Sequence, residues 1–475
     1  MKESYDVVVI GAGIGGLSAG ALLARKGLSV AVFESQPSPG GYCTSFRRKG
    51  FTFDSCLDAI SGCGEKGWLK RILKKIGIED EVEFVRLDPL RVDNFGGDII
   101  SIPGEIGAYK DLLLSMAPGE RDGIEGLFRT TASIYRTAMV TAPETLYTDP
   151  RLDGRGDDLA KYRRLTYKDL LDDFVKDHRV RAVLSDRSAF MGLPPSKVSA
   201  VAMVTMLMTF AEGGGYRIKG GAQGLADAFV NGLKNSGGEL FLGRPVSEIV
   251  HEGGSVVGVM VGGQLVRAKA VVSAVDAAKT YRMAGFDLNM NLKPSTSFFM
   301  VYLGLDKNID MPDSMGFYPG YDIEGTFSDT MRDIASSKAS VEIINYSRIS
   351  PEMAPPGCST VMLMSKAAYA YGKPWHSCKK EETDRLISLA GKALPKLSEN
   401  IAYVEAATPL TLERYTANNS GAAFGWEQGP YNRRSTAATA LPGLYMAGHW
   451  TYPGGGIESV AASGLVAAEK AALAI

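Results

Sequence analysis

The chain has 475 residues, of which 45% are hydrophobic and 22% are charged. At about 150 residues per domain, this length predicts some three domain-sized units with a core that needs no disulfide bonds. The 52 basic and 53 acidic residues give a net charge of −1. This balance offers no concentrated basic surface for a nucleic acid, and the ordinary hydrophobic content argues against a disordered chain.

The five cysteines are odd in number, and no two of them have the C-x-x-C spacing of metal or redox motifs. We therefore expect free thiols, no metal site and a reducing, cytoplasmic environment. The N-terminus enters a strand at once and lacks the pattern of a signal peptide. The longest apolar run, from Ala200 to Ala211, is shorter than the roughly 20 residues that a membrane-spanning helix needs. The sequence therefore predicts no membrane span.

The N-terminus carries a glycine-rich motif between two short apolar strands. Residues 5–10 are typical of a buried parallel strand, and the sequence GAGIGG follows at 11–16. A helical pattern then ends near Gly27, and a second strand over 29–33 leads to Glu34. A G-x-G-x-x-G motif in this strand, turn and helix context predicts a dinucleotide site in a Rossmann-type α/β domain.

Each glycine of the motif has an expected physical role. Gly11 permits the tight turn, and Gly13 lets the backbone approach a pyrophosphate at the positive end of the helix. Gly16 lets the helix pack closely on the strand. A glycine-rich turn without any ligand is the alternative, and the flanking pattern disfavours it.

The residues after the second strand distinguish between dinucleotides. We expect Glu34 to accept hydrogen bonds from the adenosine ribose, and its carboxylate would repel the 2′-phosphate of NADP. The pair Gly40-Gly41 follows shortly after, as in the extended fingerprint of FAD-binding oxidases. The sequence therefore predicts FAD.

A second glycine-rich helix start lies near the C-terminus. Residues 443–448 (GLYMAG) predict a strand and a turn, and Pro453-Gly454-Gly455-Gly456 opens the last helix at about Ile457. The free N–H groups and the dipole of such a helix end favour negative charge, which a reduced flavin develops. Three glycines favour close approach of a ligand over simple capping.

The middle of the chain predicts a return to the nucleotide domain. A helix over residues 222–236 precedes short strands at 239–242, 245–250, 256–261, 265–268 and 270–274, which alternate with glycine turns. We therefore expect a discontinuous FAD-binding domain and an inserted α+β substrate-binding domain. The FAD-binding domain would comprise 1–105, 211–290 and 436–475, and the substrate-binding domain 106–210 and 291–435. The sequence contains no second strand–GxGxxG–helix unit, so it predicts no separate pyridine-nucleotide domain.

Several motifs in a fixed order carry a family resemblance. They are GAGIGGLSAGALLARKGLSVAVFE near the N-terminus, GGYCTSFRRKGFTFD at 40–54, YRIKGGAQGLADAF at 216–229, RPVSEIV at 244–250, VVSAVD at 271–276, SRISPEMAPPG at 347–357 and GLYMAGHWTYPGGGIESVAASG at 443–464. Over nearly its whole length the sequence resembles the phytoene desaturase, carotenoid isomerase and retinol saturase group of flavoproteins. The resemblance implies one non-covalent FAD and hydride transfer at C–C bonds, by desaturation, saturation or isomerisation. It also implies a long lipophilic substrate such as an isoprenoid or polyene.

The resemblance and the motifs together assign the cofactor-binding residues. They are Gly11, Gly13, Ile14, Gly15, Gly16, Glu34, Gly40, Gly41, Tyr42, Val246, Gly448, His449, Gly456 and Ile457. Two of them depart from the family pattern. Tyr42 stands where many relatives have arginine or a small residue, and His449 stands where many flavoproteins have an aspartate on the ribityl chain.

Three residues are candidates for a direct role in the chemistry, although hydride transfer by a flavin needs no dedicated nucleophile. His449 would bond the flavin or stabilise its reduced form, or else it is a structural histidine. Trp426 would wall the flavin or the substrate channel, or else it packs in the core. Tyr216 would face the active site, or else it packs.

The apolar run from Ala200 to Ala211 has two interpretations. Its methionines adapt to irregular apolar ligands, so it would line a lipophilic tunnel or dip into a membrane surface. Otherwise it is a buried helix. A substrate that partitions into lipid leads us to expect peripheral membrane contact, while the electron partner stays open.

Two other functions share the expected fold. A flavin amine oxidase would need an aromatic cage beside the flavin, for which the sequence offers Trp426 and scattered tyrosines. A non-catalytic prenyl- or lipid-binding protein would have no use for the complete dinucleotide fingerprint.

Overall fold

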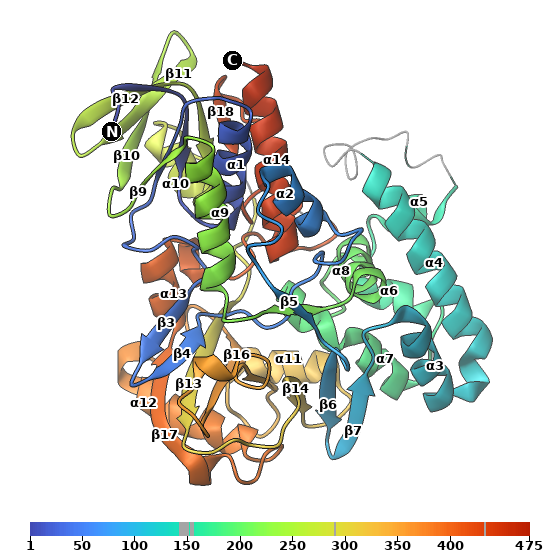
Figure 1. Ribbon diagram of the computed structural model, residues 1–475. Helices are drawn as coiled ribbons and strands as arrows, with labels where there is room; N and C mark the ends of the chain where they lie inside the picture. The colour runs from blue at the N-terminus through green and yellow to red at the C-terminus, as the bar shows by residue number, and fades with distance from the viewer. Residues whose placement is uncertain (142–151, 153–155, 289–290, 432–433) are drawn as a thin grey trace.

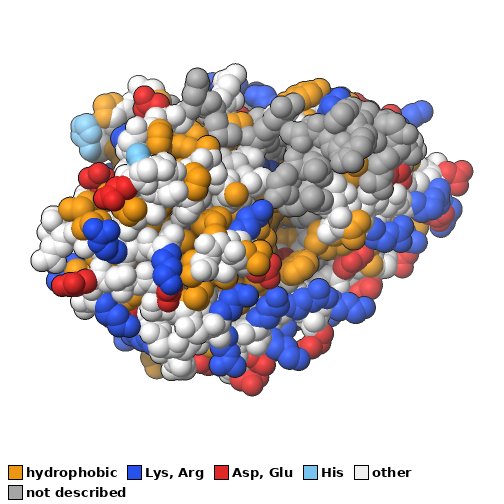
Figure 2. All heavy atoms as spheres, turned by 90° about the horizontal axis from the view of Figure 1, so that it is seen from above, with side chains coloured by type: hydrophobic (Ala, Val, Ile, Leu, Met, Phe, Trp, Pro, Cys, Tyr) orange, Lys and Arg blue, Asp and Glu red, His pale blue; other side chains and the backbone are white. Residues whose placement is uncertain are grey.

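The computed structural model describes residues 1–141, 152, 156–288, 291–431 and 434–475. Two seven-stranded sheets lie one above the other in Figure 1, and a group of helices lies beside them. The N- and C-termini both lie at the first, upper sheet. Seen from above, basic and acidic side chains are interspersed with hydrophobic ones (Figure 2).

The first sheet has the order β10-β11-β12-β1-β2-β9, and β18 also pairs with β12. Parallel pairing joins β9, β2, β1, β12 and β18, while β10, β11 and β12 pair antiparallel. Its strands are β1 (Ser4–Ile10), β2 (Val30–Phe33), β9 (Glu239–Phe241), β10 (Val246–Glu252), β11 (Ser255–Val261), β12 (Gln264–Ser273) and β18 (Leu444–Met446). Three separated stretches of the chain thus build one sheet.

Alternating side chains of β1 explain why the sheet is covered on both faces. Val7 and Val9 pack toward α1 (Ile14–Arg25), α9 (Gln223–Asn235) and α14 (Ile457–Leu473), while Val8 and Ile10 pack toward the β10–β11 side. From Val7 to Ile10 the strand is apolar and buried on both faces, as the sequence predicted, whereas Asp6 within the predicted 5–10 is partly exposed. The predicted Rossmann-type α/β fold is confirmed.

One predicted pair of strands is a single strand. The sequence pattern predicts separate strands over 265–268 and 270–274, but β12 runs through without a break. Its first half pairs with β11 and its second half with β1, so continuous hydrogen bonding carries it past Lys269. The Lys269 side chain points outward to an ion pair of 2.7 Å with Asp6.

The second sheet has the order β17-β13-β16-β15-β14-β6-β7, with only the β14–β6 pair parallel. Its strands are β6 (Arg91–Phe95), β7 (Asp98–Ile102), β13 (Ser297–Leu305), β14 (Ser314–Tyr318), β15 (Val341–Asn345), β16 (Ser359–Ala367) and β17 (Ile401–Ala407). β6 and β7 pair into this sheet, although they precede the predicted boundary at residue 105. The hydrogen bonds between β6 and β14 join segments more than 200 residues apart, so no local pattern marks them.

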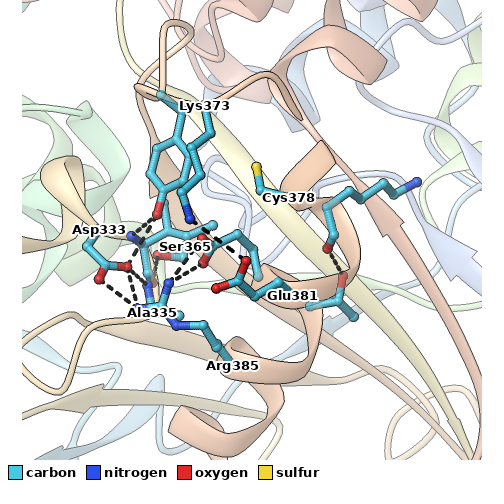
Figure 3. Close-up of polar contacts among 12 residues, drawn as sticks. Asp333, Ala335, Ser365, Lys373, Cys378, Glu381 and Arg385 are labelled. Atoms are coloured by element: carbon cyan, nitrogen blue, oxygen red, sulfur yellow. Dashed lines mark hydrogen bonds and ion pairs between the residues drawn. The ribbon is translucent and has the colours of Figure 1, made fainter. Parts of the chain in front are cut away.

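A polar network fixes α12 (Trp375–Ala390) on the outer side of this sheet (Figure 3). Arg385 donates hydrogen bonds to both oxygens of Asp333, at 2.8 and 2.7 Å, and to both oxygens of Glu382, at 3.0 and 2.9 Å. Asp333 directly follows α11 (Ile323–Arg332), so the network ties the two helices together. Below it, Trp375 stacks on Phe299 of β13 with ring centroids 5.5 Å apart.

The helical region packs around its own apolar core. It contains α3 (Ile106–Met116), α4 (Arg121–Val140), α5 (Asp158–Tyr162), α6 (Tyr167–Asp172), α7 (His178–Ser185), the 3₁₀ helices η1 (Pro118–Glu120) and η3 (Asp186–Met191), and α8 (Ala200–Gly213). Thr166 and Asp169 form a capping box at the start of α6, as their spacing predicts. Among the helices described, none is long and apolar enough to cross a membrane.

Shorter elements connect these three parts. They are β3 (Ser45–Arg48), β4 (Phe51–Asp54), α2 (Trp68–Ile76), β5 (Phe84–Arg86), β8 (Tyr216–Ile218), α10 (Ala277–Met283), α13 (Pro409–Thr416), η4 (Pro351–Met353), η5 (Ser398–Asn400) and η6 (Asn419–Gly421). All five cysteines are free thiols, as expected.

Candidate functional site

One cavity of about 1020 Å³ extends from the first sheet to α8. At one end it is lined by the residues after β2 and before β10, in its middle by the starts of α1 and α14, and at the other end by α8. The carboxyl ends of β1 and β2 open into it, which is the usual ligand position in open parallel sheets.

The start of α1 presents bare backbone to this cavity. Gly13 is the N-cap of α1, and no side chain caps the helix. A Cβ added to Gly13 would meet no atom within 4 Å, so the approach to the helix end is open. The first N–H groups of a helix lack partners within the helix and carry its positive dipole end. This end of α1 therefore suits a negatively charged group.

The neighbouring glycines are required by packing. A Cβ on Gly16 would lie 2.1 Å from the Gly11 carbonyl oxygen, and one on Gly15 would lie 2.7 Å from the Gly448 nitrogen. Gly15 lines the cavity, whereas Gly16 does not. Gly16 thus allows the close helix–strand packing that the motif predicts.

Glu34 lies at the end of β2 in a fixed orientation. Its Oε2 accepts a hydrogen bond of 2.7 Å from the Ala12 N–H, and its Oε1 accepts one of 2.8 Å from the Gln36 N–H. Val246 at the start of β10 lines the same part of the cavity. The carboxylate is therefore held beside the glycine motif, at the end farthest from α8.

The Gly40-Gly41 pair lies directly against the start of α1. Gly40 forms a bridge with Gly13, and both glycines of the pair have positive φ, at 121° and 62°. A Cβ on Gly40 would lie 2.4 Å from the Cys43 carbonyl oxygen. Only glycine fits this turn, so the second loop can approach the same ligand as the first.

The start of α14 repeats this design on the other side of the cavity. Gly456 is its N-cap with φ of 101°, and no side chain caps the helix. A Cβ on Gly455 would lie 2.9 Å from the Phe424 Cα. Two uncapped, glycine-lined helix ends therefore face one cavity, an arrangement that fits an extended anionic dinucleotide.

His449 lines the middle of the cavity, but protein oxygens already face both its ring nitrogens. Nε2 lies 3.0 Å from Asn418 Oδ1, and Nδ1 lies 3.3 Å from the Ala423 carbonyl. Asn418 Oδ1 also accepts a 2.7 Å hydrogen bond from Trp450 Nε1. Burial lowers the pKa of His449 to about 4, so the ring is neutral at pH 7. A direct bond from His449 to the cofactor stays a prediction.

The other two catalytic candidates do not line the cavity. Trp426 is buried and packs edge-to-face on Trp450, with ring centroids 4.7 Å apart. Tyr216 lies in β8, which pairs with β5, and it also bridges Ile60. Of the predicted cofactor-binding residues, all except Gly16 line the cavity.

An apolar arm of the cavity runs along one face of α8. We call it the α8 arm, and its α8 residues are Val201, Ala202, Thr205, Met206, Thr209 and Phe210. The opposite face of α8, with Met203 and Met208, packs in the helical core. The helix is therefore buried on one side, as the second interpretation expects, and lines a cavity on the other, while a lipophilic tunnel and contact with a membrane surface stay predictions.

Several lining residues were not found from the sequence. They are Leu57, Ala59, Ile60, Phe190, Gln428, Arg434, Tyr452 and Glu458. The i, i+4 spacing of Val201, Thr205 and Thr209 would have indicated a common helix face. Tyr452 and Glu458 lie within the motif at 443–464, and the remaining residues come from separate loops and helices that no spacing brings together.

Comparison with known proteins places the chain among flavoproteins. The model of the family described as flavin containing amine oxidoreductase matches residues 14–472. Prolycopene isomerase 1 from an Oncidium hybrid cultivar is 26% identical over 99% of this chain and 84% of its own length. All-trans-retinol 13,14-reductase from Danio rerio is 25% identical (94% and 83%), and the neurosporene-forming phytoene desaturase from Rhodobacter capsulatus is 26% identical (97% and 93%). The predicted resemblance is confirmed.

Solved structures share the fold at lower identity. An oxidoreductase from Methanosarcina mazei superposes with a TM-score of 0.67 at 20% identity, covering 98% of this chain and 99% of the other. Wild-type putrescine oxidase bound to putrescine gives a TM-score of 0.67 at 16% identity, with 99% of both chains covered.

Proposed function

The chain belongs to the flavin-containing amine oxidoreductase family, and from that premise we propose that it oxidises, reduces or isomerises C–C bonds of a long lipophilic substrate. The substrate class would be an isoprenoid or polyene. One observation carries the proposal: two uncapped glycine-rich helix ends and the apolar α8 arm open into the same cavity. The family match confirms the predicted flavin cofactor.

The proposed position of FAD follows from the positive helix ends and the Glu34 carboxylate that line the cavity. The start of α1 with the Gly40-Gly41 loop would hold the pyrophosphate, and Glu34 would accept hydrogen bonds from the adenosine ribose. Val246 would pack beside the adenine. Gly448, Gly456 and Ile457, at the start of α14, would lie near the flavin ring. When bound, the flavin supplies hydride transfer through its N5 atom.

The chain's own residues would orient the substrate and exclude water. The α8 arm offers mostly carbon atoms, since Thr205 and Thr209 donate their hydroxyl hydrogens to the carbonyls of Val201 and Thr205. An apolar chain gains free energy on entering such an arm. Neutral His449 adds no positive charge to the middle of the cavity. These features support a hydrocarbon substrate.

Amine oxidation is the second candidate, because putrescine oxidase shares the fold. An aromatic cage would need aromatic side chains at the cavity surface. Tyr42, Tyr302, Phe424 and Tyr452 line the cavity, whereas Trp426 does not, so aromatic side chains alone do not distinguish the two substrates. The largely apolar α8 arm is the feature that favours a hydrocarbon chain over an amine. The non-catalytic lipid-binding alternative would leave the two glycine-lined helix ends without a use. A cytoplasmic location with peripheral membrane contact is part of the main proposal.

The test begins with the protein purified without added cofactor. We expect a flavin absorption spectrum and FAD among the molecules released on denaturation. Anaerobic reduction of the flavin, seen as bleaching of its absorption, is then compared between polyenes or isoprenoids and amines. For the saturating direction, reoxidation of the reduced flavin by the same substrates is measured. Bleaching by amines alone would overturn the substrate proposal. Failure to hold FAD, even when FAD is added, would overturn the catalytic proposal and favour lipid binding.

A further inference from the structure

The α8 arm has a measurable length. Its lining residues extend along one helix face from Val201 to Phe210. At about 1.5 Å per residue, this stretch of α8 spans about 13 Å. A substrate chain that lies along the helix can therefore extend only a limited distance before it contacts the side chains at the Phe210 end of α8.

Two aromatic rings stand at that end. Phe210 of α8 and Phe190 of η3 both line the cavity, with ring centroids 6.1 Å apart. Phe210 also belongs to a small apolar cluster with Leu87 and Leu90, and it is only 6% exposed. The rings thus form a wall that is supported from behind.

Behind this wall lie two arginines that do not line the cavity. The Arg91 guanidinium lies 5.9 Å from the centre of the Phe190 ring, and that of Arg187 lies 5.9 Å from the centre of the Phe210 ring. Both arginines are 2% exposed. Cations over ring faces are attracted to them, so each arginine holds one ring of the wall in place.

Buried carboxylates fix Arg91 closely, whereas Arg187 has only a longer contact with one of them. Arg91 pairs with Asp93 at 2.8 Å and with Glu342 at 2.5 Å, and Asp186 lies 3.7 Å from each arginine. These groups come from β6, β15 and η3, so three elements hold the cluster. Displacing any one partner would leave an uncompensated buried charge, which is strongly unfavourable. The Phe190 side of the wall therefore resists displacement more than a purely apolar end would, and Leu87 and Leu90 support the Phe210 side.

We propose that Phe190 and Phe210 are the chain-length stop of the substrate site. This inference rests on the proposed lipophilic substrate and deepens it: the α8 arm takes the end of an apolar chain, and the aromatic pair limits how much of it enters. Each methylene that enters the arm adds about fourfold in affinity, and a methylene that would reach past the wall adds nothing. The two phenylalanines thus select substrates by the length from the reacting bond to the chain end.

The test measures binding of straight-chain alcohols, from hexanol to tetradecanol, to the protein as purified. Calorimetric titration gives the affinity for each chain length without relying on the flavin. We expect affinity to rise by about fourfold per methylene and then to level off at one length. A rise that continues through the series without levelling would overturn the proposal.

Variants then move the stop in both directions. Phe210→Ala and Phe190→Ala should shift the levelling point to longer alcohols, Phe210→Leu should shift it less, and Thr209→Phe should shift it to shorter ones. Phe298→Ala is the matched control, because Phe298 also lines the cavity and is 6% exposed but lies on β13. Thermal melts verify that each variant folds.

The outcomes separate this inference from the proposed function. A levelling point that stays in place in Phe210→Leu and Thr209→Phe, or that moves equally in Phe298→Ala, would overturn the length stop while leaving flavin chemistry intact. A levelling point that moves as expected in a protein that holds no FAD would support the stop and refute the catalytic proposal.

Discussion

Glu34 offers the most direct test of the cofactor position at the scale of one residue. Its two oxygens already accept hydrogen bonds from the N–H groups of Ala12 and Gln36, and these hold the carboxylate beside the glycine motif. We predict that Glu34→Gln weakens FAD binding by about tenfold or more, because hydrogen bonds to a charged group contribute about 1.5–3 kcal/mol. Fluorescence titration of the apoprotein with FAD measures this change.

A matched control for Glu34→Gln is available on the surface. Glu83→Gln removes the same charge from an exposed ion pair with Lys219, and neither residue lines the cavity. It should leave FAD affinity unchanged. Equal affinities for both variants would contradict the proposed ribose contact.

His449 makes a prediction about stability and pH. Burial lowers the pKa of His449 in the folded state to about 4 from the ordinary 6.5. Between these two pH values the unfolded chain therefore binds a proton at this residue and the folded chain does not. Stability that His449 confers above pH 6.5 is therefore lost as pH falls toward 4, by about 2 kcal/mol between pH 7 and pH 5. Buried Asp54 opposes this trend, because its pKa is raised to about 6 by desolvation.

The two titrations are separated by comparing variants. In urea unfolding at pH 7 and pH 5, His449→Asn should lose less stability on acidification than the parent chain does. His376→Asn, which changes an exposed histidine on α12, should behave like the parent. A parent-like pH dependence in His449→Asn would show that folding does not lower the pKa of His449.

At the scale of elements, the network on α12 predicts how strongly the helix is fastened. Arg385→Met leaves Glu382, whose side chain is 2% exposed, without its cation. We expect a loss of about 1–2 kcal/mol in the free energy of unfolding, discounted because Arg385 itself is partly exposed. Lys380→Met on the same helix breaks an exposed pair with Asp384 and should change little. Equal effects in urea unfolding would contradict the argument.

The elements that the sequence predicts well are those with local signals. Gly13 and Gly456 mark the starts of α1 and α14 because a glycine-rich turn after a strand has few other structural uses. The relation between Phe190 and Phe210 has no such signal. η3 and α8 are brought together by the helical core, and the arginines behind them come from β6 and from η3 itself. Trp426 is the opposite case, because it lies near a sequence motif but does not line the cavity.

At the scale of the whole molecule, the cavity is assembled from three distant parts of the chain. Glu34 follows β2, Val246 opens β10 and Ile457 opens α14, yet all three line one cavity. The sequence predicted that these parts meet, because each carries a family motif. It could not predict that β6 and β7 join the second sheet, because that pairing depends on the path of the chain between the domains.

A ligand that joins three distant parts should couple their stability. We predict that FAD raises the unfolding temperature of the apoprotein and protects it from proteolysis, with about 2.7 kcal/mol of added stability at a hundredfold excess over the dissociation constant. The protection should reach the C-terminal helix α14 as well as the N-terminal α1, because both helix ends face the same cofactor. Hydrogen exchange with and without FAD measures each helix separately. Protection of α1 alone would show that the cofactor does not reach α14, and the flavin ring would then have to lie elsewhere.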